Sequence, residues 1–351
     1  MAMPPLAASE LGRLCMVGLP GPELDDSTRA LVAEEGVNHF ILFRRNVKDP
    51  AQLTTLCRDL RERCAAAGLA APLIAIDQEG GSVTRLAPPF TQFGHARDLA
   101  EGTDPVAALT AYARTCAREL REIGINLNLA PVLDVCPADQ GLFMEKRSLG
   151  SDPHLVAELG QLVITEMQAH GVAACGKHFP GLGGANLDPH KLLPTVARTL
   201  DDLRTIDLVP FRDATAAGVA ALMTSHTLYP ALDKANPATL SALILQDLLR
   251  NELGFDGLLI TDDLEMGAIE NRWSVAEASL AALLAGADLL LICHDHHKVR
   301  ASLATLRQAL ADGRLAEGRL QRSLRRLMTM QARFAPDSST PAPRQPPDKT
   351  A

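Results

Sequence analysis

The feature that most constrains the fold is a repeat of short apolar runs, each separated from the next by a longer segment. Eight such runs occur, and each has the length of a buried strand. Buried strands that alternate with helices predict a parallel sheet, because each parallel strand needs a crossover connection before the next. The runs are Leu14–Val17, Phe40–Phe43, Leu73–Ile76, Leu127–Val132, Val172–Cys175, Val219–Met223, Leu258–Ile260 and Leu289–Ile292.

The segments between these runs carry helix signals. Leu53–Ala67 and the alanine-rich Pro105–Ile123 have helical spacing. Ser241–Leu253 places four apolar residues on one face, Ile244, Leu245, Leu248 and Leu249. Ser274 and Glu277 have the spacing of a capping box before the last strand. Eight repeats favour a single (β/α)₈ TIM-type barrel over an open doubly wound sheet. No G-x-G-x-x-G follows the first strand, which argues against a dinucleotide-binding domain.

Composition excludes several other classes of protein. Of the 351 residues, 47% are hydrophobic and 22% are charged, which suits a large core. The net charge of -8 lacks the basic character of nucleic-acid binders. Seven cysteines, an odd number without a C-x-x-C pair, predict buried thiols and neither a disulfide framework nor a zinc site.

The ends of the chain and its apolar stretches bear on location. The N-terminus shows no secretory signal, and the longest apolar stretch, Leu280–Cys293, is too short for a membrane span. We therefore expect a cytoplasmic protein without membrane contact. We also expect one barrel domain over residues 1–334 and a disordered, proline-rich tail over residues 335–351.

Barrels of this type carry their active sites at the carboxyl ends of the strands. Ionisable or hydroxyl side chains follow six of the eight runs, so we expect them to meet at the barrel mouth. They are Asp77, Asp134, Lys177, His178, Ser225, His226, Asp262, Asp263 and His294.

Two stretches contain candidate catalytic groups. The glycine-rich loop 176–194 carries Asp188 and His190, and residues two apart in an extended segment point the same way. The carboxylate can then orient the imidazole, which makes His190 a candidate acid/base. In the other stretch a strand ends in Asp262 and Asp263. Since successive strand residues face opposite sides, we expect only one of them to face the mouth. His294–His297 is expected to be a solvated loop without a metal ion.

Taken together and in order, several motifs resemble the family 3 glycoside hydrolases, in their bacterial β-N-acetylhexosaminidase branch. Members of that branch work in cytoplasmic peptidoglycan recycling. The sequence shows no second sheet domain, and in this respect it resembles the single-barrel hexosaminidases of the family. The matching stretches are Ile41–Asn46, Ile76–Gly81 with Arg85, Asn128–Asp134, Arg147–Ser148, Lys177–Gly181, Asp188 with His190, Met223–His226 and Thr261–Leu264.

The resemblance implies a retaining exo-β-N-acetylglucosaminidase that acts on peptidoglycan-derived muropeptides through a covalent glycosyl-aspartate. It implies Asp262 as nucleophile and His190, oriented by Asp188, as acid/base. It implies no metal or cofactor, no nucleic acid or membrane partner, a carbohydrate or muropeptide substrate, and we expect a monomer. The implied sugar-binding residues are Asp77, Arg85, Arg147, Lys177 and His178.

The sequence departs from the family pattern at three places. Ser82 stands where the family has an arginine, Leu182–Ala185 replaces His-Gly-Asp-Thr, and Pro189 replaces a small hydroxylic residue. These changes bear on leaving-group specificity and rate.

Other readings remain open at this point. If the altered loop no longer supports catalysis, the protein is a sugar-binding sensor without turnover. If Lys177 forms a Schiff base with a carbonyl substrate, the protein is a barrel aldolase. Within the glycosidases, phosphorolysis and cleavage assisted by the substrate's acetamido group are further variants.

Overall fold

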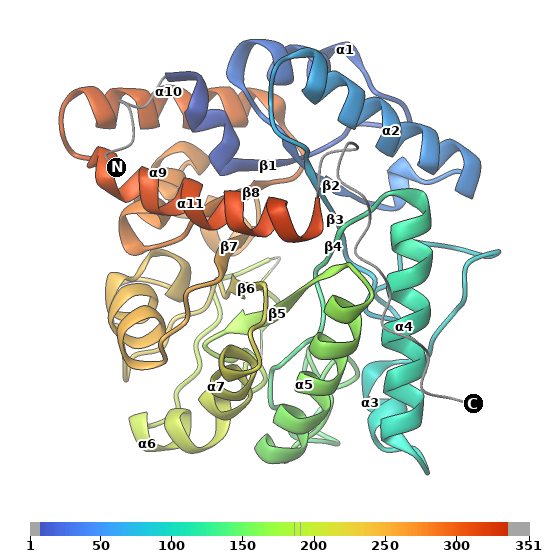
Figure 1. Ribbon diagram of the computed structural model, residues 1–351. Helices are drawn as coiled ribbons and strands as arrows, with labels where there is room; N and C mark the ends of the chain where they lie inside the picture. The colour runs from blue at the N-terminus through green and yellow to red at the C-terminus, as the bar shows by residue number, and fades with distance from the viewer. Residues whose placement is uncertain (1–7, 186, 190, 336–351) are drawn as a thin grey trace.

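Eight parallel strands close into a barrel in chain order, with β1 paired to β2 and to β8 (Figure 1). The computed structural model describes residues 8–185, 187–189 and 191–335. The predicted (β/α)₈ barrel is confirmed. The strands are β1 (Cys15–Gly18), β2 (His39–Leu42), β3 (Leu73–Ile76), β4 (Leu127–Asn128), β5 (Ala173–Phe179), β6 (Ala221–Thr224), β7 (Leu258–Asp263) and β8 (Leu289–Ile292).

Two strands differ in length from the predicted runs. Regular pairing of β4 ends at Asn128, and Pro131, which has no N–H to donate, interrupts it before Val132 forms an isolated bridge with Lys177. β5 extends past its apolar run and includes two charged or polar residues, Lys177 and His178.

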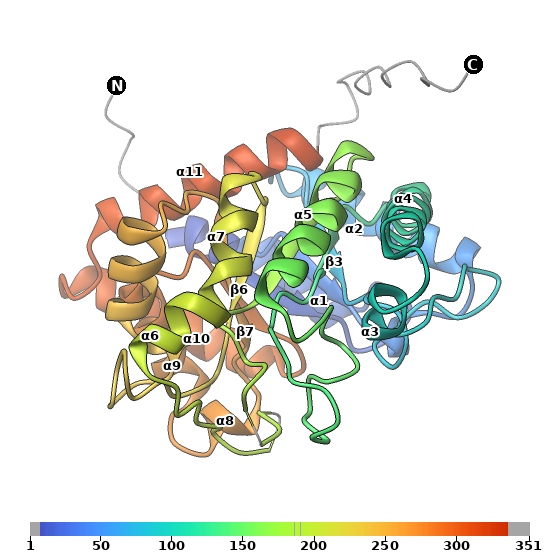
Figure 2. The ribbon, with the colours of Figure 1, turned by 90° about the horizontal axis from the view of Figure 1, so that it is seen from below.

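Helices ring the barrel on its outside (Figure 2). The capping box of Ser274 and Glu277 is confirmed, as is the predicted helix Pro105–Ile123. The α-helices are α1 (Asp26–Ala30), α2 (Pro50–Ala66), α3 (Ala96–Ala100), α4 (Pro105–Ile123), α5 (Pro153–Ala169), α6 (Leu200–Asp202), α7 (Leu208–Ala216), α8 (Gly267–Glu270), α9 (Val275–Ala285), α10 (His296–Ala311) and α11 (Glu317–Phe334).

Shorter or wider helical turns complete the ring. The apolar face predicted for Ser241–Leu253 is buried, although the segment winds as a π-helix. The 3₁₀ turns are η1 (Ala8–Leu14), η3 (Arg44–Asn46) and η5 (Ala238–Leu240), and the π-helical turns are η2 (Leu31–Glu35), η4 (Leu203–Asp207) and η6 (Leu243–Glu252).

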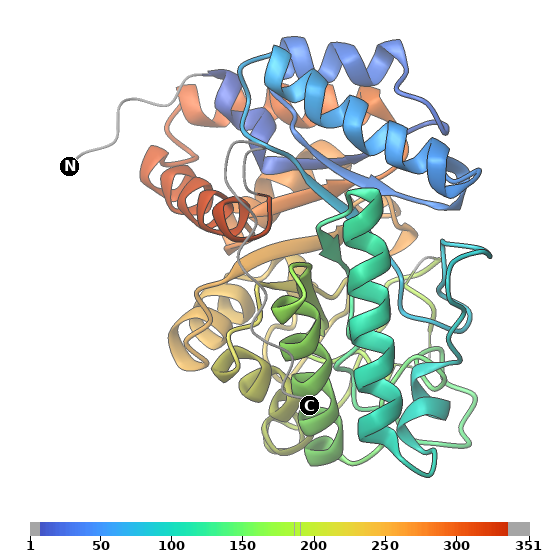
Figure 3. The ribbon, with the colours of Figure 1, turned by 45° about the vertical axis from the view of Figure 1, so that its right-hand side comes forward.

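The last helix, α11, closes the amino-terminal end of the barrel, where it contacts η1 and β7 (Figure 3). Buried Asp288, directly before β8, holds it there. Its carboxylate accepts from Ser323 on α11 at 2.6 Å and from Arg250 at 2.6 Å, and Arg319 and Arg326 of α11 lie within 3.5 Å. The ligand-binding end of the barrel is therefore the opposite one.

All seven cysteines are buried free thiols, as predicted. None of the described helices combines the length and apolar composition that a membrane crossing needs. Residues 336–351 of the predicted tail lie outside the described residues, so both the tail and the domain boundary at residue 334 stay predictions.

Candidate active site

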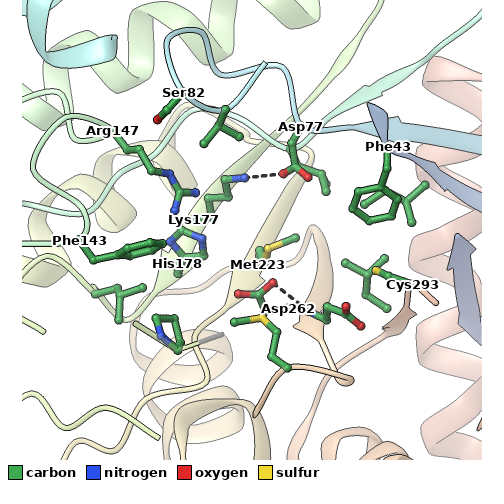
Figure 4. A pocket seen from close by; sticks show the side chains of 18 of the residues that line it. Phe43, Asp77, Ser82, Phe143, Arg147, Lys177, His178, Met223, Asp262 and Cys293 are labelled. Atoms are coloured by element: carbon green, nitrogen blue, oxygen red, sulfur yellow. Dashed lines mark hydrogen bonds and ion pairs between the residues drawn. The ribbon is translucent and has the colours of Figure 1, made fainter. Parts of the chain in front are cut away.

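A cavity of about 740 Å³ opens at the carboxyl ends of the strands (Figure 4). Its walls come from the ends of β2, β3, β5, β6, β7 and β8 and from the loops that follow them. The structure brings six of the eight predicted site residues to this one cavity. They are Asp77, Arg85, Arg147, Lys177, His178 and Asp262.

Four side chains of the cavity floor and the buried Glu79 behind them form a row of ion pairs with alternating charge. Arg85 lies 3.1 Å from Asp77, and Lys177 bridges Asp77 and Glu79 at 2.8 and 2.7 Å. Arg147 then donates two hydrogen bonds to Glu79, at 2.7 and 2.9 Å. With three cations and two anions, this row of ion pairs carries one net positive charge.

The ion pairs keep these groups charged. Burial would raise the pKa of the Asp77 and Glu79 carboxyls, but the neighbouring cations outweigh it and lower both pKa values. Burial would likewise lower the pKa of the Lys177 ammonium, but Asp77 and Glu79 raise it. The floor thus presents fixed hydrogen-bond donors and acceptors to the cavity.

His178 is oriented from behind by Asp134. The Asp134 carboxylate lies 2.8 Å from Nδ1 of His178, and it also accepts from the backbone N–H groups of His178 and Leu182. A carboxylate can only accept here, so the proton lies on Nδ1 and Nε2 is left for the cavity. Asp134, expected at the barrel mouth, does not line the cavity but holds the backbone behind it.

Asp262 and Asp263 both line the cavity, which corrects the expectation that only one of them would face it. Strict alternation fails because the register between β7 and β8 shifts between Ile260 and Asp263. A similar shift between β5 and β6 accompanies the presence of both Lys177 and His178 in the cavity wall. At each strand end, two adjacent side chains serve one site.

The two carboxylates at the end of β7 have different surroundings. Asp262 accepts only from the backbone N–H of Asp263, at 2.8 Å, among the described contacts. Asp263 accepts from the N–H of Glu265 and lies 3.5 Å from Nε2 of His294. Buried His226 supports this turn by approaching the carbonyl of Asp263 at 2.9 Å. Asp262 is therefore the carboxylate that remains for a ligand.

The glycine-rich loop after β5 leads toward the cavity. Gly183 packs so closely on Val135 that an added Cβ would lie 2.1 Å from its carbonyl oxygen. Pro189 lines the cavity, and its carbonyl accepts from Ala268 at the start of α8. Asp188 lies beside Pro189 but does not itself line the cavity. His190 lies outside the described residues, so the predicted dyad stays a prediction.

One buried group of the site was not predicted from the sequence. Glu79 forms ion pairs with Arg147 and Lys177. Its spacing two residues after Asp77 was the available signal, because such residues share one side of an extended segment. His294 was expected both at the barrel mouth and in a solvated loop. It lines the cavity, its side chain is 56% exposed, and its ring stacks on Phe43 with centroids 5.7 Å apart.

Comparison with known proteins agrees with this geometry. Residues 7–330 match the family described as Glycosyl hydrolase family 3 N terminal domain. The chain belongs to glycosyl hydrolase family 3. It is 40% identical over 287 residues to a "Beta-hexosaminidase" from Thiobacillus denitrificans, covering 80% of this chain and 77% of that one. A "Beta-hexosaminidase" from Pseudomonas aeruginosa is 37% identical over 296 residues, covering 84% and 86% of the two chains.

Solved structures of two similar proteins have the same barrel fold as this chain. A family 3 β-N-acetylglucosaminidase from Paenibacillus sp. str. FPU-7 superposes with a TM-score of 0.90 at 39% identity, covering 99% of this chain and 66% of that one. A β-N-acetylhexosaminidase from Beutenbergia cavernae superposes with a TM-score of 0.85 at 31% identity, covering 93% and 99%. The predicted family and the predicted glycoside hydrolase class are confirmed.

The departures from the family pattern have visible consequences. Ser82 lines the cavity near Arg147, where the family pattern would place an arginine (Figure 4). Leu182 is buried and donates its N–H to Asp134 at 2.6 Å. Gly184 lies close to Arg198, whose side chain would be 3.0 Å from a Cβ added at Gly184. Arg198 in turn forms an ion pair with buried Asp207. The altered loop is therefore packed into the protein up to Ala185.

Proposed function

We propose that the protein is a retaining exo-β-N-acetylglucosaminidase in which Asp262 attacks the anomeric carbon. The observation that carries this proposal is the position of Asp262 in a cavity whose floor displays the ion-paired Asp77, Lys177 and Arg147. The names of the relatives, β-hexosaminidase and β-N-acetylglucosaminidase, support the choice of substrate.

In the first step, an Asp262 oxygen forms a bond to the anomeric carbon while the bond to the leaving oxygen breaks. His190, oriented by Asp188, gives its proton to that leaving oxygen. In the second step His190 takes a proton from water, the water oxygen bonds to the anomeric carbon, and the Asp262 ester breaks. Two displacements retain the β configuration.

The floor residues bind the sugar in this proposal. Asp77 accepts from ring hydroxyls, while Lys177, Arg147 and Arg85 donate to hydroxyls and to the acetamido carbonyl. Because these groups are already ion-paired, little reorganisation is needed when the sugar binds. We further propose that the natural substrates are peptidoglycan-derived muropeptides, that the protein is cytoplasmic and acts in cell-wall recycling, and that it is a monomer.

A Schiff-base aldolase is disfavoured by the surroundings of Lys177. Asp77 and Glu79 hold its amine as the ammonium ion, which has no lone pair for attack on a carbonyl. The sensor alternative differs from the proposal only in turnover, so kinetics separate the two.

The test of the proposal is trapping and substitution at Asp262. A 5-fluoro-N-acetylglucosaminyl fluoride is expected to label the enzyme, and peptide mapping is expected to find the sugar on Asp262. Asp262→Ala is expected to lower kcat for p-nitrophenyl N-acetylglucosaminide at least ~10³-fold, with an unchanged circular dichroism spectrum. Equal turnover in the variant, or a label on another residue, would refute the assignment.

A further inference from the structure

We propose that the hollow between α11 and the amino ends of β6 and β7 binds a small molecule that carries several linked phosphate groups. Its walls include residues 218–220 and 256–258, and α11 packs beside β7 there (Figure 1). The hollow has a volume of about 630 Å³, which lies within the range of small-molecule sites. It lies at the end of the barrel opposite the catalytic cavity, so it is separate from the site assigned to the sugar.

Four arginines of α11 line one side of the hollow, and three of these have no acidic partner in the described part of the chain. Arg326 is the paired one, because its guanidinium lies 2.8 Å from Asp256 and 3.4 Å from Asp288. The other three are exposed, and they are Arg322, Arg325 and Arg333. Their N–H donors are therefore available to an anion.

The cluster around the hollow holds more positive charge than its acids balance. Arg250 and buried Arg319 lie behind the lining arginines and share the Asp288 carboxylate with Arg326. Burial lowers the pKa of the Arg319 guanidinium, and although Asp288 opposes this effect, Arg326 and Arg322 lower the pKa further. Six arginines and two aspartates leave the cluster with a net charge of +4, in a chain whose net charge is -8. A bound anion would relieve the repulsion among these cations.

The spacing of the unpaired arginines favours an extended anion. Arg322 and Arg325 are three residues apart, so they lie on the same side of α11, about one turn from each other. Arg333 lies eight residues beyond Arg325, which is about 12 Å along the helix axis. Its guanidinium lies 4.7 Å from the centroid of the Phe334 ring, at the far end of the hollow from Arg322. One phosphate group cannot reach both ends, whereas several linked groups can.

The chemistry of these cations favours phosphate over other anions. α11 carries arginines and no lysine, and a guanidinium donates two parallel N–H bonds to two oxygens of a phosphate group. A terminal phosphate also carries about -1.5 to -2 charges near pH 7, so a few such groups match the net charge of the cluster. Asp256 is the one acid among the described lining residues, and Arg326 neutralises it.

Calorimetric titration of the full-length protein with inorganic tripolyphosphate tests the site. Wild type is expected to bind one equivalent at an ionic strength of about 0.15 M, and to bind inorganic phosphate far more weakly. The double variant Arg322→Gln/Arg325→Gln is expected to raise the Kd for tripolyphosphate at least ~10-fold, because two charged donors are lost. Both side chains are exposed, so the circular dichroism spectrum should not change.

The double variant Arg118→Gln/Arg121→Gln is the matched control. These arginines of α4 are exposed, have the same spacing of three residues, and form no ion pair within the described ranges. The control removes the same two charges from the chain, so it separates binding in the hollow from attraction by net charge alone. Its Kd for tripolyphosphate is expected to equal that of wild type.

Wild type that binds no tripolyphosphate would overturn the inference, as would an equal Kd in wild type and in Arg322→Gln/Arg325→Gln. Displacement of the anion by methyl β-N-acetylglucosaminide would also overturn it, because the anion would then lie in the catalytic cavity. So would binding to a chain that ends at Ala335 but not to the full-length protein, since residues 336–351 would then be the occupant. Binding to phosphatidylglycerol vesicles without binding of tripolyphosphate would assign the arginines to a lipid surface instead.

Discussion

At the scale of single residues, the site depends on Glu79 as much as on the groups that face the ligand. Its side chain is buried, with the residue 7% exposed, and it pairs with both Arg147 and Lys177. Removing one partner of a buried ion pair lowers the free energy of unfolding by more than the intact pair adds to it. The reason is that the remaining charge stays buried without a counter-charge.

Glu79→Gln is expected to lower the free energy of unfolding by about 3 kcal/mol at pH 7, measured by urea denaturation. The folded pKa of Glu79 is lowered by its cations. Its stabilising contribution is therefore full above the unfolded pKa of about 4.3 and is lost as the pH falls below that value. The difference between wild type and variant should shrink from about pH 5 downward.

A difference that stayed constant down to about pH 2 would contradict this ion-pair account. Glu62→Gln is the matched control, since Glu62 lies on α2 with its side chain 70% exposed. Its stability should change by less than ~0.5 kcal/mol.

His190→Ala tests the proposed proton donor. Poor leaving groups need protonation as the glycosidic bond breaks, whereas nitrophenolate does not. The variant is expected to lose far more kcat/KM on a disaccharide than on the p-nitrophenyl glycoside. An equal loss on both substrates would argue that His190 is not the acid.

At the scale of elements, the predicted strands end too early for a physical reason. The apolar runs stop at Cys175 and Ile260, but β5 and β7 continue through Lys177 and Asp262. Lys177 can lie there because Asp77, directly after β3, pairs with its charge, and Asp262 can because it faces the cavity. Hydropathy along one strand does not contain this information, so the irregular ends that build the site were not predictable from it.

Asp288→Ala is expected to destabilise the protein by about 3–5 kcal/mol, because Arg250 and Arg319 would lose their buried counter-ion. Thermal unfolding measures this effect. Since Asp288 lies at the end of the barrel opposite the cavity, kcat/KM per folded molecule is expected to stay within twofold of wild type. A variant as stable as wild type would show that α11 is held by its apolar contacts alone.

At the scale of the whole molecule, the alternation of runs and helices was sufficient to predict the closed barrel. The positions that follow the predicted strands also identified several polar residues of the cavity, since residues at strand ends converge in this topology. They are Asp77, Lys177, His178, Asp262, Asp263 and His294, whereas Arg85 and Arg147 were implied by the family resemblance. The loops were less predictable. Whether Phe143 lines the cavity depends on loop shape, which rests on contacts such as Glu145 with Asp139.

A chain ending at Ala335 is expected to fold and turn over like the full-length protein. α11 ends at Phe334, which is 6% exposed, so the described core is complete there. The melting temperature should change by less than ~1 °C, since every described helix and strand is kept. A fall of several degrees would place residues 336–351 in the folded domain.

The packing of η1 against α11 has a practical consequence. The first and last described helices both lie at the amino end of the barrel, opposite the cavity. A bead, a carrier protein or a fluorophore joined through either helix would therefore sit at the back of the enzyme, and an immobilised preparation should process dissolved glycosides as quickly as the untethered one.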